Sequence, residues 1–261
     1  MRRARLMRSP EELRTLVEGY LGDLALTPEL HGQAESVRYA LVGGKRVRAV
    51  ICLATAEAAG AEPEAALPAA AALELVQAFS LVHDDLPALD NDAERRGRPS
   101  VWAQHGEAVA VLAGDALLAE AFRLALSYPF PHVGRELAQA TLGMIGGQYL
   151  DITGTAPDEA TLHKLKTGCL FAASVGVALW VAEVPERDQA PWRGFGDQLG
   201  LLFQIVDDIL DRDGYVLTHG EDGARRLADQ AATRARDRLA DVRADTSTLV
   251  EIVDGLATRT S

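Results

Sequence analysis

The stretch "PEAALPAAAALELVQAFSLVHDDLPALD", Pro63 to Asp90, is typical of one long apolar helix that ends in a group of carboxylates. A helix without a polar face is buried, and an unpaired buried carboxylate is very costly. Asp84, Asp85 and Asp90 therefore predict a bound cation at the end of a core helix. Pro87 disfavours continuation of the helix, so we expect the chain to turn there and bring Asp90 back towards Asp84.

A second carboxylate cluster lies in "LLFQIVDDILDRDG", where Asp207 and Asp211 share a helix face with Asp208 beside them. Carboxylates this close repel one another and need a multivalent cation, and oxygen-only ligation favours Mg²⁺. Mg²⁺ usually keeps only one or two carboxylates and takes its other ligands from water and substrate phosphates. Two such clusters facing across a bundle therefore predict a metal-bound phosphorylated ligand, although one cluster alone is more typical of a solvated helix end.

Basic side chains accompany both clusters. "GGKRVR", residues 43–48, follows a Gly-Gly break where the backbone can approach an anion. "ERRGRPS" follows the first aspartate cluster, and "HKLKTG" adds Lys166 and Thr167. Each patch alone is more typical of a solvated surface. In a chain of net charge −12, however, their combination with acidic metal sites predicts a polyanionic ligand, because arginine forks fit phosphate oxygens.

The rest of the chain is typical of an all-α protein. Hydrophobic residues make up 48% and aromatic residues 5% of the 261 residues, and strand-like alternation is scarce. We expect a single domain spanning residues 1–261, folded as a bundle of antiparallel helices. Besides the helices around the first cluster, the pattern predicts Gly106–Leu126, Val133–Leu150, Pro157–Val184 with a break near Gly168, Trp192–Arg212, Gly223–Arg243 and Thr246–Thr258.

Several classes of protein are disfavoured. The acidic charge disfavours nonspecific binding of nucleic acid. The basic N-terminal residues are not followed by an apolar segment, so we expect no signal peptide. We also expect no membrane insertion, because no stretch of about 20 residues is both uncharged and strongly apolar. Cys52 and Cys169 do not form a metal-spaced pair, and we expect them to be reduced core thiols of a cytoplasmic protein.

Taken together, the chain resembles the trans (type I) prenyl diphosphate synthases, and among them a bacterial farnesyl diphosphate synthase. The resemblance covers roughly residues 37–211 and rests on an ordered set of motifs: "GGKRVR", "HDDLPALD", "RRGRPS", "AVLAGDALL", "GGQYLD", "KTG" and "FQIVDDILD". It implies an all-α homodimer of the isoprenoid synthase type, with a central active-site cavity between the two aspartate motifs.

The resemblance also implies a reaction. Isopentenyl diphosphate would be condensed head-to-tail with dimethylallyl or geranyl diphosphate through a Mg²⁺-assisted allylic carbocation. Up to three Mg²⁺ ions would be held by Asp84, Asp85, Asp90, Asp207, Asp208 and Asp211. The allylic substrate would contact Arg95, Lys166, Thr167 and Gln204, with Lys166 among the catalytic residues. The diphosphate of isopentenyl diphosphate would contact Gly44, Lys45, Arg48 and Arg96, with Gln77 beside them.

Product length has a candidate determinant in Phe79, which lies five residues before Asp84, ~7.5 Å down the helix axis. In the family that the chain resembles, a bulky aromatic residue here closes the floor of the pocket. Phe79, followed by Ser80, therefore predicts a C15 product, with C10 and C20 open. The alternative is that Phe79 is an ordinary core residue.

The chain departs from the family pattern in two places. Gln77 stands where such synthases often carry a histidine, and no lysine follows Asp211, which leaves Arg225 or Arg226 as possible substitutes. Two other functions therefore stay open: a lyase of the terpene synthase type and a non-catalytic partner subunit of a related synthase. His83 and His105 are expected to pack beside the site rather than to transfer protons.

Overall fold

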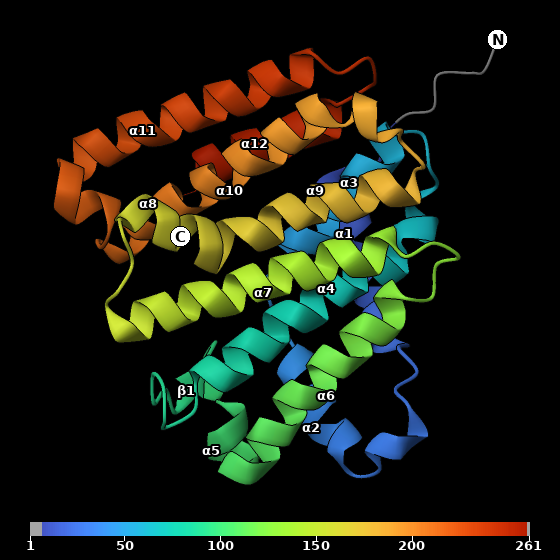
Figure 1. Cartoon of the computed structure of the whole chain (residues 1–261), viewed down its shortest axis with the longest axis vertical. Helices are drawn as coiled ribbons and strands as arrows, with labels where there is room; N and C mark the ends of the chain where they lie inside the picture. The colour runs from blue at the N-terminus through green and yellow to red at the C-terminus, as the bar shows by residue number, and fades with distance from the viewer. Residues whose placement is uncertain (1–6, 260–261) are drawn as a thin grey trace.

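The computed structural model describes residues 7–259, whose regular secondary structure is almost entirely helical (Figure 1). The helices are α1 (Pro10–Gly22), α2 (Gln33–Leu41), α3 (Val47–Ala58), α4 (Pro63–Asp84), α5 (Val101–His105), α6 (Glu107–Ala125), α7 (His132–Thr153), α8 (Glu159–His163), α9 (Cys169–Val181), α10 (Ala190–Asp211), α11 (Tyr215–Ala240) and α12 (Ser247–Ala257). A π-helical turn, Lys164–Gly168, joins α8 to α9. Two-residue strands, β1 (Glu94–Arg95) and β2 (Arg98–Pro99), form a small hairpin. The all-α prediction is confirmed.

Local sequence signals set some helix ends. Ser9 and Glu12 cap α1 reciprocally: the Glu12 N–H donates to Ser9 Oγ at 3.3 Å, and the Ser9 N–H donates to Glu12 Oε2 at 2.8 Å. The predicted start of the helix at Gly223 is wrong, because α11 begins eight residues earlier, at Tyr215. Gly220 has non-helical dihedral angles (φ 71°, ψ 164°), so a short helical segment precedes the regular part of α11.

Helix α4 runs through the middle of the bundle and packs against α3, α6 and α9 (Figure 1). Helix α10 packs between α9 and α11. The two helices that carry the aspartate clusters are therefore connected through α9, an apolar core helix. Gly200 of α10 permits this packing, since a Cβ there would lie 3.2 Å from Gly168 Cα and Phe171 Cβ.

Two helical segments, Pro63–Asp84 and Glu159–Val181, are long and apolar enough to cross a membrane by length and composition alone. Their most apolar windows are 67% and 50% buried inside the fold, as in the core helices of globular proteins. Both cysteines are free thiols, as expected. Cys52 is buried, and Cys169 is half-buried against Gly143 of α7.

Candidate active site

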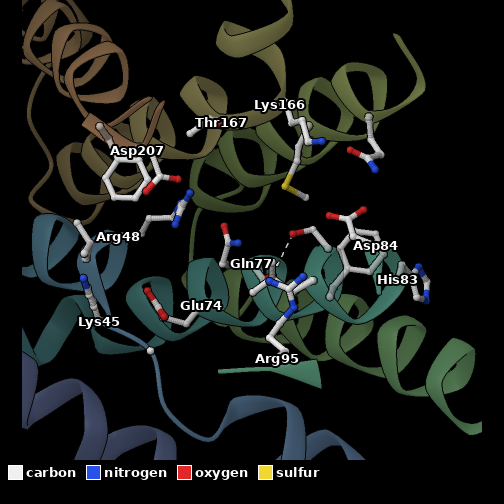
Figure 2. Close-up of a pocket in the computed structure, with 18 of the residues that line it drawn as sticks. Lys45, Arg48, Glu74, Gln77, His83, Asp84, Arg95, Lys166, Thr167 and Asp207 are labelled. Carbon is white, nitrogen blue, oxygen red and sulfur yellow. Dashed lines mark hydrogen bonds between the residues drawn. The ribbon is translucent and has the colours of Figure 1, made fainter. Parts of the chain in front are cut away.

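A cavity of about 1020 Å³ lies among the end of α4, the start of α3, α7, the π-helical turn and α10 (Figure 2). This volume is at the upper end of the range for small-molecule sites. Its charged lining residues are Lys45, Arg46, Arg48, Glu74, Asp84, Arg95, Arg96, Lys166, Asp207 and Arg259. Gly44, Gln77, Phe79, Ser80 and Thr167 also line it. The cavity is therefore strongly basic within a chain whose net charge is −12.

Asp84 is the last residue of α4 and marks one end of the cavity. The Asp90 N–H donates to the Asp84 carbonyl oxygen at 2.9 Å, which confirms that the chain turns back after Pro87. Burial raises the pKa of the Asp84 carboxyl to about 6; Lys166 opposes this shift and the Asp90 charge adds to it. A carboxylate that is destabilised in this way, with a second carboxylate nearby, suits a hard cation.

The neighbouring Asp85 is buried and does not line the cavity. It accepts hydrogen bonds from Arg95, whose Nε and Nη2 atoms lie 2.7 and 2.5 Å from its Oδ1 atom. Burial raises the pKa of the Asp85 carboxyl, and the Arg95 hydrogen bonds oppose the shift. Asp85 therefore holds Arg95 at the cavity wall, while Asp90 lies exposed on the loop.

Asp207 of α10 lies across the cavity from Asp84 (Figure 2). Burial raises the pKa of its carboxyl, Arg259 opposes the shift, and the Asp211 charge adds to it. Asp211 itself is exposed and does not line the cavity. Each aspartate cluster thus places one carboxylate, Asp84 or Asp207, in the cavity wall.

Asp208 is buried and faces a different side of α10. It accepts hydrogen bonds from Gln204 Nε2 at 2.6 Å and from the Tyr215 N–H at 2.9 Å. Its ligand atoms lie within 4.8 Å of those of Glu159 and His163, a group that could hold a metal ion. In this structure Gln204 orients Asp208 and does not line the cavity.

The "GGKRVR" loop supplies a basic wall of the cavity beside the Glu74 end of α4. Arg46 has a left-handed backbone (φ 53°), and its buried side chain donates to the Leu41 carbonyl at 2.5 Å and to Glu18 at 2.9 Å. Glu74 of α4 accepts from the Ala49 N–H at 3.2 Å, which ties the start of α3 to α4. These contacts fix the loop, so that Lys45 and Arg48 reach the cavity (Figure 2).

The Arg48 side chain is partly buried in the cavity wall. Its guanidinium carbon is 4.4 Å from the centre of the Phe171 ring, and its Nε atom is buried without a hydrogen-bond partner. Burial lowers the pKa of Arg48 to about 10, with Glu74 and Asp207 opposing the shift. The side chain is therefore charged at neutral pH and suited to an anionic ligand.

Gly44 allows Arg96 to approach the backbone of the same loop. Gly44 has φ +102°, and a Cβ atom there would lie 3.1 Å from Arg96 Nη1. Any other residue would be strained by the backbone and crowded by the guanidinium. The structure thus brings the predicted residues Gly44 and Arg96 together.

Lys166 lies on the π-helical turn, a rare geometry that is frequent at functional sites. Its Nζ atom pairs with Asp151 Oδ2 of α7 at 2.5 Å. Gly147 of α7 permits this approach, because a Cβ there would lie 2.5 Å from the Lys166 N atom. The "GGQYLD" motif therefore positions Lys166, and Thr167 lines the cavity beside it.

Sequence reasoning assigned no role in the site to Glu74, Asp151 or Arg259, and it considered Arg46 only as a member of the "GGKRVR" basic cluster. The sequence did offer one sign that Glu74 has a specific role, because it is a lone carboxylate within an apolar helix. His83 lies beside the site as expected: it lines the cavity, and its Nε2 atom lies 3.0 Å from the Val111 carbonyl oxygen. His105 packs edge-on against Tyr39.

The polyprenyl synthetase family model matches residues 33–233, and the chain belongs to this family. It is 42% identical over 193 residues to a geranylgeranyl diphosphate synthase from Cyanophora paradoxa, a match that covers 68% of this chain and 64% of that protein. It is 39% identical over 196 residues to a farnesyl diphosphate synthase from Bacillus subtilis, a match that covers 69% of this chain and 66% of that protein.

The chain spans about half to two thirds of the length of the curated relatives it matches. A solved structure of a geranyltransferase from Legionella pneumophila superposes with a TM-score of 0.85 at 30% identity, over 96% of each chain. The fold is therefore shared along almost the whole chain.

Proposed function

We propose that the protein is a prenyltransferase that condenses isopentenyl diphosphate with an allylic diphosphate. The observation that carries this proposal is one basic cavity with a partly buried carboxylate at each end, Asp84 and Asp207. Arg48 and Lys45 lie on the Asp207 side, and Lys166 and Arg95 lie nearer Asp84 (Figure 2). Because its wall carries basic side chains towards both ends, the cavity suits the binding of two diphosphates. The names of the relatives support the same reaction.

The chain's carboxylates fit Mg²⁺, because Asp84 and Asp207 are hard oxygen ligands whose ionised forms are destabilised by burial. Bound Mg²⁺ would neutralise the diphosphate and act as a Lewis acid on the leaving group. Lys166 and Arg95 would stabilise the same negative charge as it develops. Asp85 keeps Arg95 in place for this role, and Asp151 does so for Lys166.

The cavity's apolar lining would protect the reaction from water. The C–O bond of the allylic diphosphate breaks to give a carbocation, the double bond of isopentenyl diphosphate attacks it, and a new C–C bond forms. The released diphosphate accepts the proton that is lost. Phe79, Met144 and Phe203 line the space in which the cation would form. Neither histidine near the site is required for these steps.

We propose that the product is farnesyl diphosphate. Phe79 is 8% exposed and lines the cavity one helical turn and a half below Asp84, with its ring edge-on against His83. The relatives' names include both farnesyl and geranylgeranyl diphosphate synthases, so the alternatives are geranyl and geranylgeranyl diphosphate.

Phe79→Ala should lengthen the main product by at least one five-carbon unit, because it removes the side chain that closes the pocket. The measurement is chromatography of products made from labelled isopentenyl diphosphate and geranyl diphosphate. Val82→Ala is the matched control, since Val82 is buried on the same helix and does not line the cavity. An unchanged product length for Phe79→Ala would contradict this role.

The lyase and partner-subunit alternatives are less well supported. A lyase has one diphosphate to bind, whereas this cavity has basic groups towards both ends. A non-catalytic subunit has no need for two partly buried carboxylates in a basic cavity. Gln77, which lines the cavity where a histidine is frequent, would donate a neutral hydrogen bond to the diphosphate.

We also propose a soluble, cytoplasmic homodimer. Helix α7 exposes Leu142, Ile145, Tyr149 and Ile152 at a spacing that forms one stripe; Ile145, Tyr149 and Ile152 also line the cavity, whereas Leu142 lies outside it, near Val111 and Leu112, which neighbouring α6 exposes. Exposed apolar side chains that gather on neighbouring helices are typical of an interaction site. Such a stripe on two adjacent helices suits a second copy of the chain.

Leu142→Asp should convert the dimer to a monomer at micromolar concentration, because it buries a charge in the interface. The measurement is analytical ultracentrifugation. Leu217→Asp on α11 is the control, since Leu217 is 76% exposed and lies outside the stripe. A wild-type protein that sediments as a monomer would contradict the proposal.

A further inference from the structure

A second group of metal-ligating side chains lies outside the candidate active-site cavity. Glu159 and His163 are four residues apart on α8, so they share one face of that helix. Asp208 of α10 lies beside them, and the ligand atoms of the three residues are all within 4.8 Å of one another. None of the three lines the cavity. An ion bound here would therefore be separate from Mg²⁺ ions held by Asp84 and Asp207.

The His163 ring lies close to both carboxylates, at distances that suit a shared ion. Its Nε2 atom is 3.4 Å from Glu159 Oε1 and 3.9 Å from Asp208 Oδ2. Both distances exceed the roughly 2.7–3.2 Å of a good N–H···O hydrogen bond. By contrast, the ligand atoms of a tetrahedral ion, each about 2.1 Å from it, lie about 3.4 Å from one another. The spacing is thus closer to that of metal ligands than to that of a tightly hydrogen-bonded triad.

Neighbouring groups orient both carboxylates, as outer-shell partners do around metal ligands. Asp208 accepts a hydrogen bond from Gln204 Nε2 at 2.6 Å through Oδ1 and one from the Tyr215 N–H at 2.9 Å through Oδ2. Thr218 Oγ1 donates to Glu159 Oε2 at 3.2 Å, so the other oxygen of Glu159 is the one nearest the imidazole. A carboxylate oxygen has two acceptor sites, and Asp208 Oδ2 can therefore also bind an ion.

Gly214 leaves room beside these oxygens. It directly precedes α11, and a Cβ atom there would overlap Asp208 Oδ2 and lie 3.2 Å from Glu159 Oε1. A side chain at this position would therefore fill the space next to the ligand atoms. The side chains of His163 and Asp208 are only 18% and 8% exposed, so water competes weakly for them.

We propose that Glu159, His163 and Asp208 form a Zn²⁺ site that joins α8 to α10. One imidazole and two carboxylates are ligands that Zn²⁺ takes, with a fourth position for water, whereas Mg²⁺ prefers oxygen ligands alone. His163 directly precedes the π-helical turn that carries Lys166, so the ion would fasten this turn to α10. Without a metal, the same group would be a protonated His163 paired with two carboxylates.

The test is a titration of the purified protein with Zn²⁺ against a chromogenic chelator, in excess Mg²⁺ so that the cavity carboxylates are occupied. We expect the wild type to bind one Zn²⁺ per chain. His163→Gln should weaken binding more than about 100-fold, beyond the roughly 10–100-fold effect of losing an outer-shell partner. His31→Gln is the matched control, since His31 is exposed and lies outside the group, and it should bind Zn²⁺ like the wild type.

Equal affinities of His163→Gln and the wild type, equal losses in His163→Gln and His31→Gln, or no binding by the wild type would overturn the assignment. If His163→Gln does not fold, anomalous diffraction from wild-type crystals soaked in Zn²⁺ decides. A zinc peak within bonding distance of His163 Nε2 would support the site, and the absence of such a peak would overturn it. Neither experiment uses a prenyl substrate or turnover, so the outcome is independent of the proposed function.

Discussion

Asp84→Asn is expected to lower the rate of condensation about 1000-fold, equivalent to about 4 kcal/mol of lost transition-state stabilisation. Asparagine keeps the shape of the side chain but removes the charge that a Mg²⁺ ligand supplies at the end of α4. The measurement is kcat/KM for isopentenyl diphosphate with saturating Mg²⁺. Asp229→Asn, at an exposed position on α11, is the control and should leave turnover unchanged.

The same substitution should stabilise the metal-free protein. The pKa of Asp84 in the folded state is about 6, above its ordinary value of 3.8, so ionisation of this carboxyl opposes folding. That penalty is absent below about pH 4 and develops fully as the pH rises through 6. Without Mg²⁺ at pH 7.5, Asp84→Asn should gain about 1–2 kcal/mol, a value reduced for partial solvent exposure. A lower melting temperature, or retained turnover, would count against the role of Asp84.

Arg48→Met should raise the KM for isopentenyl diphosphate about 100-fold, with a smaller effect on kcat. The guanidinium is held against Phe171 with a buried, unpartnered Nε atom, so the substrate's diphosphate would provide its missing partner. A hydrogen-bonded charge pair of this kind is worth about 2–3 kcal/mol. Steady-state kinetics with each substrate varied in turn provide the measurement.

Methionine keeps the apolar stem of Arg48, so packing against Phe171 should survive the change. Arg225→Met on the exposed face of α11 is the matched control and should leave both KM values unchanged. An Arg48→Met enzyme with a normal KM for isopentenyl diphosphate would show that Arg48 has a structural role only.

Much of the fold follows from local signals. The all-apolar run before Asp84 predicts a core helix, and Pro87 predicts the turn that brings the Asp90 N–H to within 2.9 Å of the Asp84 carbonyl. Such signals depend only on nearby residues, which is why they can be recognised in the sequence. The early start of α11 was missed because Gly220 interrupts the helical pattern there.

The orientation of each aspartate depends on packing and is harder to predict. Successive helix residues point about 100° apart, so Asp84 and Asp85 could not both face one cavity from a regular helix. In the structure the Asp85 carboxylate accepts a hydrogen bond from Arg95, and the Asp208 carboxylate accepts one from Gln204. Both pairs join residues that the sequence places in the site, but it gives no sign that they pair with one another.

Contacts between distant segments were beyond the reach of sequence patterns. The Arg46 side chain donates to Glu18 and to Glu74, each 28 residues away in the sequence. The Arg259 side chain contacts Asp207, 52 residues away. No spacing or motif in the sequence predicts any of these contacts. These long-range pairs nevertheless determine where the basic wall of the cavity lies.

The most direct test of the account is an incubation of the purified protein alone with Mg²⁺, labelled isopentenyl diphosphate and geranyl diphosphate. Parallel samples omit isopentenyl diphosphate or contain a chelator in place of Mg²⁺. We expect labelled C15 product only when all three components are present. Consumption of geranyl diphosphate without isopentenyl diphosphate would indicate a lyase, and no incorporation under conditions where a known synthase works would contradict the central claim.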